Sequence, residues 1–505
     1  MHVFFMTLIE RKSFMSKSNI RLVTVALLLA NVMSGIDSTI VNTALPAIIA
    51  DLHGLQLMAW IVAVFLLGTA VSTLLWSKLG QRRSYKFAYQ LAALTFVIGS
   101  LLQGLSPNIW LLIITRGIAG IDNGGMISLP YIMFVDLYPN VRDRMKTLAL
   151  VSGFYSFATI IGPLVGGFLV DALSWHWIFY INVPIGLLSI LLVQIYYKVP
   201  RSAPVAAPLD VRGSVALVVL LISLLGAIEM IGMVKLPVIL GLVVVAVLAM
   251  VLLLRTEKHA KDPVIPLRVF RNFPLVMDFL LFTLVWGAFV AFLTYAPMWA
   301  QGLLGTTALV GGATQIPAAF TNVAGSESVP MMRRHYTPHQ VLTFNIVLLT
   351  ISFVLMAVLN VHAPFWLLLV AGAFEGWGNG ACFNELQVKV QVDAEEQDVS
   401  VATSFSFLIR MLSQTFTVAI FGLLMNQQLA KGVASHPGIT MGMMNKLSDS
   451  NSAASLPKKL LPAMREILHS GLHNIMLLAL ALMLISLVLN LYAGRKEASL
   501  KTRAQ

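Results

Sequence analysis

The sequence predicts an all-α polytopic membrane protein. Of its 505 residues, 58% are hydrophobic and only 11% are charged, whereas a soluble domain is about 45–50% apolar and about 25% charged. The apolar runs are also continuous, as in Leu240–Leu254 and Leu480–Leu491. A membrane β-barrel would instead alternate apolar and polar residues along each strand. These observations exclude a soluble domain, a disordered chain and a barrel.

At about 20 residues per span, the chain has room for fourteen membrane helices. Each predicted span is an apolar run of about the length that crosses a hydrocarbon core of about 30 Å. The spans, in chain order, are 22–50, 58–79, 87–105, 109–136, 147–171, 177–197, 213–233, 237–255, 275–299, 307–331, 341–360, 364–387, 400–425 and 472–493.

The distribution of lysine and arginine predicts the orientation. Of 34 basic residues, 26 fall in segments on the same side as the N-terminus, six fall on the other side, and Arg116 and Arg410 lie within spans. Cytoplasmic loops carry an excess of Lys and Arg, so both termini are expected in the cytoplasm. The net charge of +12 is explained by these loops, and no nucleic-acid partner is expected.

Three motifs carry a family resemblance. The first span contains Ile36-Asp37-Ser38-Thr39-Ile40-Val41-Asn42-Thr43-Ala44-Leu45-Pro46, the fifth contains Gly162-Pro163-Leu164-Val165-Gly166-Gly167, and Trp175–Gly186 leads into the sixth. In this order and spacing they resemble the fourteen-helix drug:proton antiporters of the major facilitator superfamily, over about residues 20–425.

The sequence departs from the family pattern at two places. The loop after the second span keeps Arg82 and Arg83, but Gln81 stands where the family has an aspartate. In the fourth span, Arg116 is kept, while Ala119 replaces a glutamine and Asp122 replaces a glycine.

The resemblance implies the major facilitator fold, with two six-helix bundles and two inserted helices. The expected organisation is a cytoplasmic segment 1–21, a bundle 22–197, a linker 198–274 holding the inserted helices, a bundle 275–493 and a tail 494–505. It implies a monomer in a bacterial inner membrane, whose partners are protons, small amphiphilic or cationic substrates and the lipid bilayer. The outer loop 426–471 is the region where an adaptor protein would bind.

The glycine motif has a mechanical interpretation independent of the resemblance. Gly162, Gly166 and Gly167 give one helix a face without side chains, which allows another helix to approach closely. Pro163 removes a backbone hydrogen bond and permits a bend. This face is interpreted either as plain helix packing or as a seam that seals and rocks during transport, together with the Arg82 and Arg83 loop.

Ionisable residues at membrane depth are the leading functional candidates, because each costs at least about 2.5–3.5 kcal/mol to insert. Asp37 lies about 22 Å from the inner face and Arg116 about 10 Å from the outer face, so we predict that they form an ion pair. The same reasoning predicts a second pair, Glu375 with Arg410. Asp122 has no basic partner at its depth, and a buried carboxyl group of that kind can hold a proton near neutral pH. Asp37, Asp122 and Glu375 are therefore the proton-coupling candidates, although each is also compatible with a structural role.

By resemblance, the first, fourth, ninth and twelfth spans line the substrate cavity. Aromatic, Met and amide side chains there suit lipophilic cations through stacking and cation–π attraction, although packing is the alternative for any one of them. The cavity candidates are Thr39, Asn42, Asn123, Met126, Trp286, Phe289, Tyr295, Trp377 and Asn379.

The predicted function is proton-coupled export of amphiphilic or cationic drugs by alternating access. The alternatives are a proton-coupled carrier dedicated to one solute, such as a metabolite or siderophore, and a receptor without transport. An enzyme is not expected, because the single cysteine, Cys382, has no histidine partner within the spans. No cofactor or metal is predicted, and no phosphate-binding loop of the G-x-x-x-x-G-K-[ST] form occurs.

Overall fold

The computed structural model of the chain describes residues 16–138, 140–198, 211–231, 234–257, 267–395 and 398–504. These residues form helices and connecting loops, with no strand among them. Ten helices in this part of the chain are long and apolar enough to cross a membrane. The helical class is therefore confirmed. A helix overlaps each of the fourteen predicted spans, but fourteen as the number of crossings stays a prediction.

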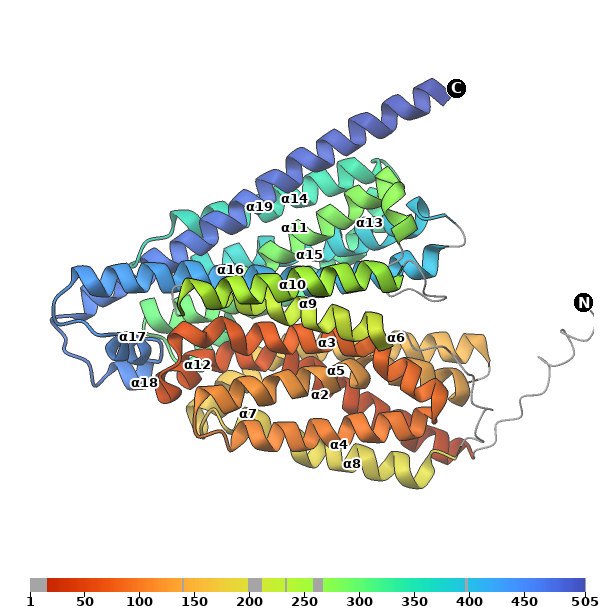
Figure 1. Ribbon diagram of the computed structural model, residues 1–505, viewed down its shortest axis with the longest axis horizontal. Coiled ribbons are helices and arrows are strands. Elements are labelled where there is room, and N and C mark those ends of the chain that lie inside the picture. Colours follow the sequence, from red (N-terminus) through yellow and green to blue (C-terminus); the bar gives the residue numbers. More distant parts are fainter. Residues whose placement is uncertain are drawn as a thin grey trace, which may run out of the picture.

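The N-terminal bundle fills the lower half of Figure 1, in red to yellow. Polar side chains begin several of its helices by accepting a backbone N–H, as Ser16 does from Asn19 at 3.2 Å and Asn108 from Leu111 at 3.0 Å. Its helices are α2 Lys17–Leu52, α3 Met58–Arg82, α4 Tyr85–Gly104, α5 Ile109–Leu137, α6 Val141–Ala172, α7 Trp177–Tyr180 and α8 Asn182–Tyr196.

The C-terminal bundle fills the upper half of the same view. A π-helical turn follows α11, and Gly305 has a φ of 66°, a conformation open to glycine without steric cost. The predicted span 307–331 is two helices that meet at Thr314. The helices are α11 Phe273–Met298, α12 Ala308–Ala313, α13 Gln315–Met332, α14 Pro338–Val358, α15 Phe365–Asp393, α16 Val399–Ser435 and α19 Leu461–Ala504.

Two further helices lie between the bundles, α9 Val211–Glu229 and α10 Leu236–Glu257 (Figure 1). They pack on each other, and α9 also contacts α3 and α16. Only 17% of the most apolar stretch of α10 is buried against the rest of the protein. Most of the surface of α10 is therefore suited to contact lipid. The predicted linker 198–212 lies largely outside the described residues, as does most of the segment 1–21.

The predicted outer loop 426–471 is mostly helical. Helix α16 continues to Ser435 and α19 already begins at Leu461, while α17 Met441–Leu447 and α18 Ser450–Ala453 fill the interval. Met444 is fully buried, because this segment covers the ends of the bundles. We call this the closed end of the molecule.

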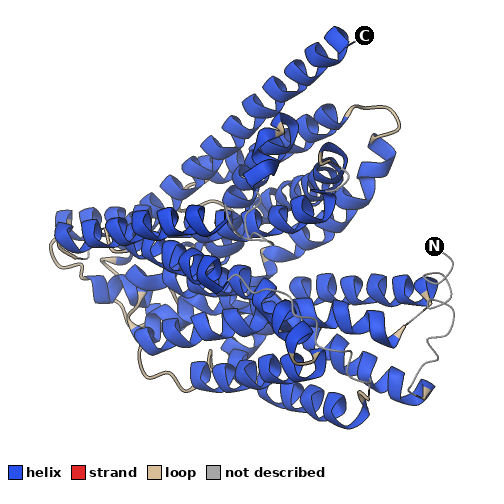
Figure 2. Ribbon diagram, turned by 45° about the vertical axis from the view of Figure 1, so that its right-hand side comes forward, coloured by secondary structure: helices blue, strands red, loops and turns tan. Residues whose placement is uncertain are grey.

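The two bundles are joined at the closed end. Asn426 Nδ2 donates a hydrogen bond to the Gln56 backbone oxygen at 2.8 Å, and the Leu55 N–H donates to Asn445 Oδ1 at 3.1 Å. Figure 2 shows the ribbons of the two bundles spreading apart toward the opposite end, where α19 ends. We call that opposite end the terminal end.

Candidate transport site

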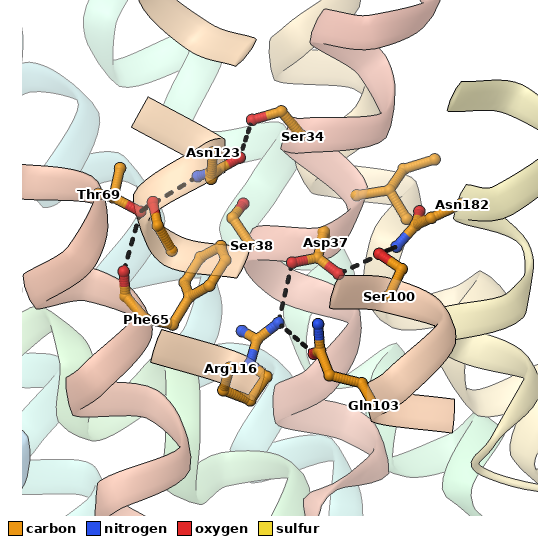
Figure 3. Close-up of polar contacts among 12 residues, drawn as sticks. Ser34, Asp37, Ser38, Phe65, Thr69, Ser100, Gln103, Arg116, Asn123 and Asn182 are labelled. Carbon is orange, nitrogen blue, oxygen red and sulfur yellow. Dashed lines mark hydrogen bonds and ion pairs between the residues drawn. The ribbon is translucent and has the colours of Figure 1, made fainter. Parts of the chain in front are cut away.

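Asp37 and Arg116 form an ion pair inside the N-terminal bundle. Arg116 Nη1 lies 2.9 Å from Asp37 Oδ2, and both side chains are at most 3% exposed. Asn182 Nδ2 donates to the other carboxylate oxygen at 3.2 Å, and Gln103 Oε1 accepts from Arg116 at 3.3 Å (Figure 3). Such extra hydrogen bonds are what a buried ion pair needs to offset its desolvation.

The pair ties together much of its bundle. The guanidinium also lies over the Phe65 ring, 3.9 Å from its centroid, and Asn182 reaches Ser100 at 3.4 Å. The contacts come from α2, α3, α4, α5 and α8. Sequence reasoning named only the two charges. Gln103, an amide near the end of an apolar helix, was the available signal for a partner.

Asn123 occupies a second polar cluster in the same bundle. Ser34 donates to Asn123 Oδ1, and Asn123 Nδ2 donates to Thr69 Oγ1 at 3.3 Å (Figure 3). Met126, the other cavity candidate of α5, is fully buried in the apolar core of the bundle. In this conformation the side chains of Asn123 and Met126 therefore contact neighbouring helices and do not face an open surface.

Asp122 faces away from these clusters, toward α4. One of its oxygens accepts from Thr95 Oγ1 at 2.7 Å, and the other is buried without a hydrogen-bond partner. No lysine or arginine of the described residues lies within ion-pair distance of it. Asp122 stays a candidate proton site, on a different helix face from its neighbour Asn123.

The predicted pair of Glu375 and Arg410 is not formed. The Arg410 guanidinium lies over Phe383, 4.9 Å from the ring centroid. Phe383 is eight residues from Glu375, which is about 12 Å along a helix. The two charges therefore occupy different levels of the bundle. Glu375 is 1% exposed, and its Oε1 has no hydrogen-bond partner.

The remaining aromatic and amide candidates fall into two groups. Trp286 makes an edge-to-face contact with Phe383, with ring centroids 5.7 Å apart, and Phe289 is half-buried against the core. Tyr295 is buried and packs on Phe421 at 6.1 Å. On α15, Trp377 Nε1 and Asn379 Oδ1 are buried without a hydrogen-bond partner among the described residues.

The glycine motif contacts helices of both bundles. A methyl group on Gly162 would lie 2.2 Å from Thr39 Oγ1, and one on Gly166 would lie 2.7 Å from Ile40. A methyl group on Gly167 would lie 2.5 Å from the Leu309 backbone in α12, across the boundary between bundles. Because these glycines have no side chains, α6 can approach α2 closely on one face and α12 of the other bundle on an adjacent face.

Further contacts complete this seam. The Pro163 backbone oxygen would meet a methyl group on Gly312 at 2.3 Å. The carboxylate of Asp171 accepts from the Ala308 and Leu309 N–H groups at 3.1 and 2.8 Å. Asn42 Oδ1 accepts from Thr294 at 3.4 Å. Sequence reasoning missed Asp171, a loop-proximal acid without a distinguishing motif.

Charged residues at the terminal end behave differently in the two bundles. Arg82 and Arg83 are exposed at the end of α3, and Arg83 lies 5.6 Å from the Phe87 ring. In the C-terminal bundle, Lys389 lies 3.5 Å from Asp278, 2.7 Å from Asp393 and 3.3 Å from Glu497. This lysine cluster joins α11, α15 and α19.

Residues 27–418 match the family model described as Major Facilitator Superfamily. Multidrug resistance protein 3 of Bacillus subtilis (strain 168) is 26% identical over 503 residues, which cover 97% of this chain and 98% of that protein. Multidrug transporter protein MdtP of the same organism is 29% identical, over 80% of this chain and 75% of its own length.

Solved structures of similar fold include a bacterial homolog of the human lysosomal transporter Spinster. It aligns with a TM-score of 0.65 at 14% identity and covers 95% of this chain and 98% of its own. A POT peptide transporter aligns with a TM-score of 0.64, also at 14% identity, over 94% of this chain and 95% of its own. The match over most of the chain and the shared fold lead to one conclusion: this multi-pass membrane protein belongs to the major facilitator superfamily and is a transporter, not an enzyme.

Proposed function

We propose that the chain exports amphiphilic drugs by alternating access, in exchange for protons. The observation that carries this proposal is the buried Asp37–Arg116 pair, held by Asn182 and Gln103 at the centre of one bundle. Two relatives named as multidrug proteins support the substrate class. Relatives named as efflux pumps, such as dotC of Dothistroma septosporum, support the direction.

Protonation of Asp37 is the proposed coupling step. A proton on the carboxylate removes its charge and leaves the Arg116 guanidinium buried without an anion, which is strongly unfavourable. The bundle then gains free energy by moving Arg116 toward water or toward another anion. Proton binding and rearrangement of α2 against α5 are thereby linked. Asp122 and Glu375 are the reserve proton sites.

Alternating access requires the seam at the closed end to open. In that motion the Gly167–Leu309 contact and the Asp171 hydrogen bonds would break while the terminal ends approach each other. The excess of basic residues in the segments on this side supports a cytoplasmic terminal end. We therefore infer that this conformation opens toward the cytoplasm of a bacterial cell, where a drug would enter.

The test uses the full chain in proteoliposomes with an imposed pH gradient. Transport of ethidium and of one neutral drug is followed in wild type, Asp37→Asn and Asp143→Asn. Asp143 is exposed near the start of α6, so its variant controls for loss of one carboxylate. We expect gradient-driven transport in wild type and in Asp143→Asn, and at least about a tenfold loss in Asp37→Asn, equivalent to about 1.4 kcal/mol.

Three other outcomes would change the proposal. Transport by Asp37→Asn at the wild-type rate would remove Asp37 from the coupling. Proton movement in wild type without transport of either compound would favour a carrier dedicated to one solute. Ligand binding with neither proton nor drug movement would favour a receptor.

A further inference from the structure

Arg410 is a cation set among aromatic rings instead of carboxylates. Its guanidinium carbon lies 4.9 Å from the centroid of Phe383, 5.0 Å from that of Phe407 and 5.7 Å from that of Trp286. No aspartate or glutamate of the described residues lies within ion-pair distance of it, and its Nε is buried without a hydrogen-bond partner. The side chain is half-buried.

This arrangement leaves the charge only partly compensated. An arginine at membrane depth costs at least about 2.5–3.5 kcal/mol, and a cation–π contact returns about 0.5–2 kcal/mol. The rings also hold the planar guanidinium in place without occupying its hydrogen-bond donors. A guanidinium with free donors is suited to a carboxylate, which it binds through two parallel hydrogen bonds.

The position of Arg410 is open to a ligand and lies between the bundles. Phe383, next to it, is 36% exposed. Tyr155 of α6, from the other bundle, lies close enough to interact electrostatically with Arg410 and reaches Ser38 of α2. Transporter substrates bind at such a boundary, because both bundles must contact the substrate during alternating access.

The carboxylates in the middle of the membrane-spanning region are not available to bind a cationic ligand. Asp37 is already paired with Arg116, while Asp122 and Glu375 are at most 3% exposed. Among these charges, Arg410 is the residue that is partly exposed, so an entering molecule can reach it.

We propose that Arg410, with Trp286, Phe383 and Phe407, forms a subsite for the carboxylate of an aromatic, amphiphilic acid. The rings receive the apolar part of the molecule and the guanidinium receives its anionic group. This inference rests on the proposed export of amphiphilic drugs and adds aromatic carboxylic acids to the compounds that the protein would bind.

The test compares naphthaleneacetic acid with naphthaleneacetamide, which differ in the carboxylate. Equilibrium dialysis measures the binding of each to the purified full chain at about pH 7, where the acid is ionised. Because a hydrogen bond to a charged group contributes more than a neutral one, we expect wild type to bind the acid about tenfold more tightly. Arg410→Gln should bring the ratio to about one, and Arg410→Lys should keep part of it.

Lys431→Gln is the matched control, because Lys431 is an exposed cation near the far end of the same helix. It should keep the wild-type ratio. Equal binding of both compounds by wild type, survival of the ratio in Arg410→Gln, or its loss in Lys431→Gln would each overturn the proposal. Binding is measured without transport. A wild-type protein that fails in the proteoliposome assay would therefore count against drug export, while the ratio of the affinities for the acid and the amide would still test the subsite.

Discussion

The arginines in the middle of the two bundles have different surroundings. In the N-terminal bundle, Arg116 is paired with Asp37, and neighbouring amides hydrogen-bond to both side chains, although Arg116 Nε has no hydrogen-bond partner. In the middle of the C-terminal bundle, Arg410 and Glu375 have no ionic partner among the described residues. An arginine paired with a carboxylate responds to protonation of that carboxylate, whereas an arginine without an anion can bind an anionic ligand. We therefore propose that Asp37 and Arg116 serve proton coupling and that Arg410 serves substrate recognition.

The largest expected effect comes from breaking the satisfied pair. Arg116→Gln leaves the Asp37 carboxylate buried without a cation, which should lower the free energy of unfolding by about 3–5 kcal/mol. Reversible unfolding of the purified protein in mixed detergent measures this loss. The double variant Asp37→Asn, Arg116→Gln should recover part of it, since neither charge remains. A double variant as unstable as the sum of the two singles would refute pairing as the cause.

A smaller effect is expected at the lysine cluster. Lys389→Gln leaves the carboxylates of Asp278, Asp393 and Glu497 near one another, and should cost about 1–3 kcal/mol. Two of these acids are partly exposed, with side chains 17–19% accessible, which moderates the cost. Lowering the pH protonates them, so the stability gap to wild type should narrow in acid. A gap that is independent of pH would contradict the electrostatic explanation.

The smallest effect is expected at Glu375. Because this carboxyl group has no ionic partner, Glu375→Gln should change the free energy of unfolding by less than about 1 kcal/mol. The same unfolding experiment provides the measurement, with Arg116→Gln as the large-effect reference. A loss of about 3–5 kcal/mol would mean that Glu375 does have a buried cationic partner, and the contrast between the bundles would fail.

Much of the architecture was predictable because apolar length alone identifies membrane helices. The similar membrane depth of Asp37 and Arg116 followed from the helical rise of about 1.5 Å per residue. The structure places the two side chains in contact. The same reasoning failed for Glu375 and Arg410. Depth along a span does not account for helix tilt or for the side of the helix that a residue occupies. Helices α15 and α16 carry polar residues along much of their length, so their sequences do not single out the side on which Glu375 and Arg410 would meet.

The packing of the outer loop 426–471 was not predictable for a related reason. Buried apolar side chains such as Met444 and Met464 hold it against the bundles. Tertiary packing of that kind is not visible in local composition. Asp171 was missed because its partners are backbone N–H groups of a helix that is distant in sequence. No side-chain motif predicts such a contact.

The inserted helix α9 has a mechanical consequence. It touches α3 in one bundle and α16 in the other, and the buried side of α9 is largely apolar, including Leu217, Leu220, Leu221 and Leu225. Contacts between such surfaces are non-directional, so one set can replace another at little cost as the surfaces slide. Helix α9 can thus fill the space between the bundles with an apolar surface that excludes lipid. The bundles can still move relative to each other, because no directional contact has to break.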